Sequence, residues 1–131
     1  MSIFKICLVY LIVNICFSTY GQTNKNPSGQ VPADLSQYWI YSHEEDSAGV
    51  KVYRPKGYKF AASRGRTAMD LHPDGTYTEY KIGPTDVPFT IPGKYEVSED
   101  GKSLLLTPTD ARTKPRKFEV VEVTKEKLKV K

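Results

Sequence analysis

From Leu35 onward the sequence is a series of short runs rich in β-branched and aromatic residues, separated by turn residues and lacking any apolar stripe at helical spacing. The runs that predict strands are 38–44, 50–54, 66–72, 76–82, 90–98, 102–107, 117–124 and 127–131. Two tripeptides, Pro73-Asp74-Gly75 and Glu99-Asp100-Gly101, have the composition of tight hairpin turns. The pattern therefore predicts an all-β domain.

Short connections between successive strands predict an eight-stranded antiparallel up-and-down meander. Such a sheet either folds into two stacked layers or closes into a barrel, and closure removes its exposed edges. We expect a small barrel in which the last strand pairs with the first. An open sandwich is the alternative.

The amino-terminal region predicts export. Ile6–Phe17 is apolar except for Asn14 and is too short to cross a bilayer as a helix, but it suits a secretory signal. We expect a signal peptide over 1–21 with cleavage after Gly21, a flexible tether over 22–34 and the barrel domain over 35–131. The expected location is secreted or periplasmic, without a stable membrane span after cleavage. An uncleaved anchor and lipid attachment at Cys16 are the alternatives.

Cysteine use and charge exclude some classes of function. Cys7 and Cys16 both lie in the predicted signal, so the mature domain would have no disulfide, thiolate metal site or cysteine nucleophile. The formal net charge of the whole chain is +4, and losing Lys5 with the signal removes one positive charge. This modest charge does not by itself predict nucleic-acid binding.

The order of several short motifs resembles that of the small lipocalin-like barrel proteins of the bacterial envelope. The motifs are Trp39, Asp74-Gly75-Thr76-Tyr77, Gly93-Lys94-Tyr95, Leu104–Leu106, Phe118–Val123 and Leu128–Val130. The resemblance implies a lipocalin-like barrel that binds a small hydrophobic or amphiphilic molecule. An eight-stranded interior also fits its own side chains alone. The alternative is therefore a filled barrel acting as a protein-interaction module, such as an envelope assembly factor or inhibitor.

The stretch Tyr53–Arg66 combines basic and aromatic residues without an acid, directly after the acidic trio Glu44, Glu45 and Asp46. Bases with aromatics occur in single-strand nucleic-acid platforms, but the predicted export and the adjacent acids argue against a nucleic-acid partner. We expect a lid over the barrel mouth, with Arg54 paired to the acidic trio. The expected ligand-binding residues are Trp39, Tyr41, Tyr58, Phe60, Arg64 and Arg66, with an anionic group of the ligand at an arginine.

Nothing in the sequence predicts catalysis. The only histidines, His43 and His72, lie at predicted strand ends, and the chain has no nucleophile elbow, phosphate-binding loop or metalloprotease helix. We therefore expect a non-enzymatic protein with no catalytic residues, no cofactor and no metal.

Overall fold

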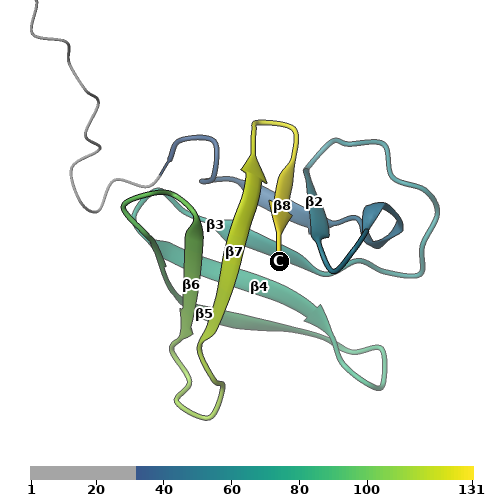
Figure 1. Cartoon of the computed structure of the whole chain (residues 1–131). Coiled ribbons are helices and arrows are strands. Elements are labelled where there is room, and N and C mark those ends of the chain that lie inside the picture. The colour runs from purple at the N-terminus through teal and green to yellow at the C-terminus, as the bar shows by residue number, and fades with distance from the viewer. Residues whose placement is uncertain (1–31) are drawn as a thin grey trace, which may run out of the picture.

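A computed structural model describes residues 32–131, which form eight strands and one short 3-10 helix. The elements are β1 (Tyr38–Tyr41), η1 (His43–Glu45), β2 (Lys51–Pro55), β3 (Ala68–Leu71), β4 (Thr76–Ile82), β5 (Pro88–Val97), β6 (Ser103–Pro108), β7 (Arg116–Val123) and β8 (Leu128–Val130) (Figure 1). The predicted signal and most of the tether lie outside the described residues.

The strands form one closed antiparallel barrel, which confirms the predicted fold class. From β3 to β8 each strand pairs with the next, as in an up-and-down meander. The first two strands depart from that order, because β1 pairs with both β2 and β3 while β2 pairs with β8. The expected pairing of the first strand with the last is therefore wrong: the barrel closes between β2 and β8.

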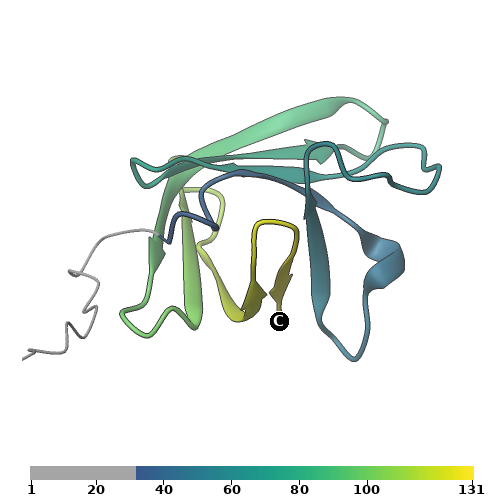
Figure 2. The ribbon, with the colours of Figure 1, turned by 90° about the horizontal axis from the view of Figure 1, so that it is seen from above.

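This exchange of β1 and β2 explains the length of the connection over residues 56–67. Since β1 lies between β2 and β3 in the sheet, the chain must pass β1 to enter β3. The connection stands out from the barrel wall as a wide loop (Figure 2). We call residues 56–67 the crossover loop.

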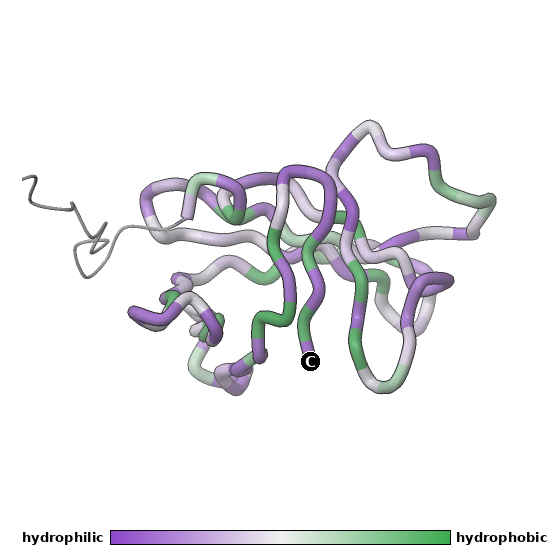
Figure 3. Tube along the Cα trace, turned by 45° about the horizontal axis from the view of Figure 1, so that its top comes forward, coloured by the Kyte–Doolittle hydropathy of each residue, from purple (hydrophilic) through white to green (hydrophobic). Residues whose placement is uncertain are grey.

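The core follows from alternation along the strands, which places every second side chain inside the barrel. Hydropathy alternates visibly along β7 and β8 (Figure 3). The buried core comprises Leu35, Trp39, Met69, Leu71, Tyr77, Tyr95, Leu104, Leu106, Leu128 and Val130. Large side chains therefore fill much of the interior.

One end of the barrel is closed by the segment that precedes β1. The Leu35 side chain is buried in the core, and its carbonyl oxygen accepts a 2.9 Å hydrogen bond from Trp39 Nε1. This bond satisfies the indole N–H, which would otherwise be buried without a partner. Trp39 therefore has a structural role at the closed end.

Local predictions are confirmed at two turns and wrong in one segment. Gly75 and Gly101 have φ angles of 86° and 71°, the left-handed conformation that the predicted hairpin turns require. The expected first strand over 38–44 ends at Tyr41, and His43–Glu45 forms η1 instead. No helix among residues 32–131 is long and apolar enough to span a bilayer.

Candidate functional site

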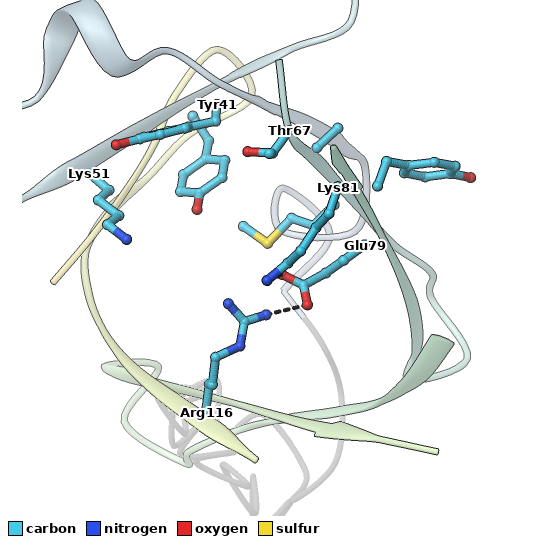
Figure 4. Close-up of a pocket in the computed structure, with 10 residues that line it drawn as sticks. Tyr41, Lys51, Thr67, Glu79, Lys81 and Arg116 are labelled. Carbon is cyan, nitrogen blue, oxygen red and sulfur yellow. Dashed lines mark ion pairs between the residues drawn. The ribbon is translucent and has the colours of Figure 1, made fainter. Parts of the chain in front are cut away.

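The end of the barrel opposite Leu35 contains an open polar pocket of about 150 Å³. Figure 4 shows its side chains converging from strands on different sides of the barrel. The pocket is lined by Tyr41, Lys51, Tyr53, Thr67, Ala68, Met69, Glu79, Tyr80, Lys81 and Arg116. The pocket thus lies in the interior of the barrel, which exists only because the sheet closes.

Glu79 and Arg116 form an ion pair across this pocket. Glu79 lies on β4 with the inward-facing Tyr77 two residues before it, so alternation directs its side chain into the barrel. Arg116 begins β7, where it pairs with the buried Leu106 of β6. Glu79 is only 7% exposed, so the guanidinium supplies the opposite charge that a buried carboxylate needs.

The pocket has an excess of positive charge. Lys51, Lys81 and Arg116 point into the space drawn in Figure 4, and Glu79 is the single carboxylate among the lining residues. The Lys81 ammonium is 4.0 Å from Glu79, whereas no ion pair involves Lys51 in the part of the chain described. One positive charge balances the Glu79 carboxylate, so the pocket has a net excess of two positive charges.

Tyrosines form the wall of the pocket between β1 and β2. The rings of Tyr41 and Tyr53, partners in the sheet register, are 5.2 Å apart. Burial and the negative charge of Glu79 raise the pKa of Tyr53 to about 12. The Tyr41 hydroxyl donates a hydrogen bond to Asp46, which raises the pKa of Tyr41 to about 12. Both phenols are consequently neutral at physiological pH.

The crossover loop and β2 are each held to η1 by one forked ion pair. The Nη1 and Nη2 atoms of Arg66 donate hydrogen bonds of 2.8 and 2.7 Å to the two carboxylate oxygens of Glu44. Arg54 binds both oxygens of Glu45, with a distance of 2.8 Å between Nε and Oε2. These hydrogen bonds lower the pKa of Glu44 to about 2 and also lower the pKa of Glu45. Such two-point contacts fix orientation as well as charge.

Aromatic stacking connects the two ion pairs. The Arg54 guanidinium lies 4.7 Å from the centre of the Tyr58 ring, and the Arg66 guanidinium lies 4.6 Å from that of Phe60. The two rings meet edge to face with their centres 4.9 Å apart. The two arginines and the two aromatic rings thus form one continuous set of contacts. This set covers η1 and β2, and none of its residues lines the pocket.

The structure separates the residues expected to bind a ligand. Trp39 lies in the core, whereas Tyr41 lines the pocket. Arg64 is exposed, and Arg66 is paired with Glu44, so the two arginines do not converge on one point. Asp46 accepts from Tyr41 and from the backbone N–H of Val52, and it forms no ion pair with an arginine among residues 32–131.

Sequence reasoning missed the four charged residues of the pocket, Lys51, Glu79, Lys81 and Arg116. A signal for two of them was present, because Glu79 and Lys81 share a strand face with Tyr77. A charged residue on the apolar face of a strand indicates a buried pair or a site. Nothing in the sequence indicated that Arg116, which lies far away along the chain, would meet this face of the strand.

Residues 32–131 contain no cluster of three or more histidine, cysteine, aspartate or glutamate side chains that could hold a metal ion. No protein-family model, curated protein or solved structure matches this chain.

Proposed function

We propose that this protein is a non-enzymatic binding protein that takes a small anion-bearing molecule into the polar mouth of its barrel. The observation that supports this proposal is the pocket with three cations and one carboxylate. Cations that converge in a partly enclosed space attract an anion more strongly than scattered surface lysines do, since water screens them less.

The pocket volume restricts the ligand class. At about 30 Å³ per water molecule, a 150 Å³ pocket has room for roughly five waters or a molecule of similar bulk. Drug-sized ligands occupy pockets of roughly 300–1,000 Å³. Trp39 and Leu106 fill the barrel below the pocket. We therefore favour a small carboxylate or phosphate compound, or the anionic head of an amphiphile, over a molecule enclosed along a hydrophobic chain.

The proposed location remains secreted or periplasmic. It rests on the apolar run over Ile6–Phe17 and the small residues that follow it. Intact-mass analysis of protein purified from its own cells should give an amino terminus at Gln22. Full-length protein or a lipid on Cys16 would contradict this location.

Titration with inorganic phosphate and acetate, followed by amide chemical shifts, tests the binding proposal. Shifts should concentrate on β2, β4 and β7, and an uncharged sugar should cause none. Lys51→Gln and Lys81→Gln should each weaken binding by roughly fivefold, the equivalent of about 1 kcal/mol. Lys94→Gln and Lys102→Gln remove the same charge from exposed positions outside the pocket and should leave binding unchanged. Equal weakening by both pairs of variants would indicate a nonspecific charge effect and contradict the proposal.

A further inference from the structure

The β4–β5 hairpin projects beyond the barrel wall. Residues 88–92 of β5 pair with β4 on one side, whereas pairing with β6 begins only at Gly93. The strand pair extends past its neighbours and ends in the turn before Pro88 (Figure 1). Its tip is therefore not covered by the sheet on either side.

This tip exposes apolar side chains. Ile82, Val87 and Phe89 are 41%, 61% and 46% exposed. Single exposed apolar residues are ordinary, but a group of three on one projecting hairpin indicates a contact surface.

The basic crossover loop lies beside the hairpin. The Ile82 side chain rests directly against Gly65, where any Cβ would collide with it, so Arg64 is adjacent to the tip of the hairpin. Lys56, Lys59 and Arg64 are exposed and form no ion pair among the described residues. The loop contains no acid, and Asp86 is the only one in the hairpin turn. Apolar and cationic groups are thus combined on one side of the molecule.

The backbone of the hairpin argues against a partner that adds a β-strand. Pro92 O accepts from Thr109 N on the β6 side, whereas Tyr95 N donates toward β4. Alternation therefore directs positions 88, 90 and 92 to the open edge. Two of these are prolines, which have no N–H, so Thr90 offers the only donor along this stretch. An edge so poor in donors is a weak template for strand addition.

We propose that the tip of the β4–β5 hairpin and the crossover loop together bind an anionic lipid surface. The apolar tip would enter the boundary between headgroups and acyl chains, and the three free cations would lie at the lipid phosphates. Two modest signals of this kind combine to hold a protein on a membrane where neither is sufficient alone. None of the three apolar and three cationic residues named for this surface lines the pocket, and the proposal does not depend on a ligand there.

Fluorescence quenching by lipids brominated on their acyl chains tests insertion of the tip. Trp39, the only tryptophan of the chain, is fully buried and provides an unquenched background. Phe89→Trp places a second indole at the tip. On vesicles of equal parts phosphatidylcholine and phosphatidylglycerol, its emission should be quenched and shifted to the blue. Because the added indole is at the tip, its quenching reports contact between the tip and the lipid, even where other parts of the full chain also bind the vesicles. Absence of quenching would overturn the proposal.

Charge variants test the role of the crossover loop in the Phe89→Trp background. Replacing Lys56, Lys59 and Arg64 with glutamine should reduce quenching at limiting lipid, because the three losses weaken partitioning by roughly a hundredfold. Replacing Lys94, Lys102 and Lys125 with glutamine removes the same charge elsewhere and should have little effect. An equal loss of quenching in both triple variants would show that only net charge matters, and it would contradict a specific role for the crossover loop. Quenching that is as strong on pure phosphatidylcholine would do the same. If the emission of the Phe89→Trp variant does not change on vesicles but changes when a protein partner is added, the lipid proposal is wrong and the surface is a protein interface.

Discussion

Glu79 of β4 and Arg116 of β7 meet across the barrel interior, although β5 and β6 separate their strands in the sheet. The pair joins opposite parts of the wall at the open end. At the other end, Leu35 and Trp39 close the barrel with apolar contacts and one indole hydrogen bond. The two ends thus differ in chemistry as well as in access.

The first prediction concerns this ion pair. Arg116→Met should lower the free energy of unfolding by about 2 kcal/mol, because it leaves the buried Glu79 with only the more distant Lys81. The double variant Glu79→Gln/Arg116→Met should recover at least half of that loss, since it removes both charges. Urea denaturation of the four proteins in the cycle measures the coupling. Independent, additive effects would show that the pair has no energetic role.

The second prediction concerns the ion pair that joins β2 to η1. Arg54→Lys keeps the charge but loses the forked contact with Glu45, and it should cost about 1 kcal/mol because both side chains are partly buried. Arg112→Lys is the matched control. Arg112 makes a similar forked contact with Asp110 but is 90% exposed, so its change should have almost no effect on stability. Equal urea midpoints for the two variants would contradict a structural role for the Arg54 pair.

The third prediction is a loss of stability in acid. The bond from Arg66 lowers the pKa of Glu44 from 4.5 to about 2 in the folded protein. A carboxyl with a depressed pKa stabilises the fold above its unfolded pKa and loses that contribution as pH falls through its folded pKa. The urea midpoint should therefore decline between pH 4.5 and pH 2. In Glu44→Gln this decline should be shallower, and an unchanged slope would exclude Glu44 as a source.

The fourth prediction is a loss of stability in alkali. Burial raises the pKa of Tyr53 from 10.0 to about 12. A phenol with a raised pKa contributes stability that is complete below the unfolded pKa and is lost as pH rises through the folded pKa. Stability should thus decline between pH 10.0 and pH 12. Tyr41 ionises in the same range, so Tyr53→Phe and Tyr41→Phe are compared. A difference in phenolate absorbance between the folded parent protein and Tyr53→Phe that appears at the normal pH for tyrosine would contradict the prediction.

The fold class was predictable because its signals are local. Alternation along each run marked the strands, and Gly75 and Gly101 marked turns that need a left-handed residue. The pairing of Arg54 with Glu45 was also predictable, since the two strand ends are joined by a short connection.

The order of the first two strands was not predictable from local signals. The strands β1 and β2 form the same antiparallel pair in both possible orders, with β2 next to β3 as in a simple meander or with β1 next to β3 as observed. The length of the crossover loop was the available evidence, because hairpin loops usually have two to five residues and this connection is far longer. The pocket was missed for a related reason: its charged residues come from β2, β4 and β7, and only the closed barrel brings them together.

The seam that closes the barrel has a consequence for biosynthesis. It joins Lys51–Tyr53 of β2 to Leu128–Val130 of β8 through three residue pairs. The barrel therefore cannot close until residue 130 has left the ribosome, and until then the apolar inner faces of β3–β7 have no complete partner. Contacts so distant in sequence form slowly, because the intervening chain must be ordered first. A nascent chain of this kind remains vulnerable to aggregation until synthesis reaches β8, so we expect its folding in the cell to depend on a holding chaperone.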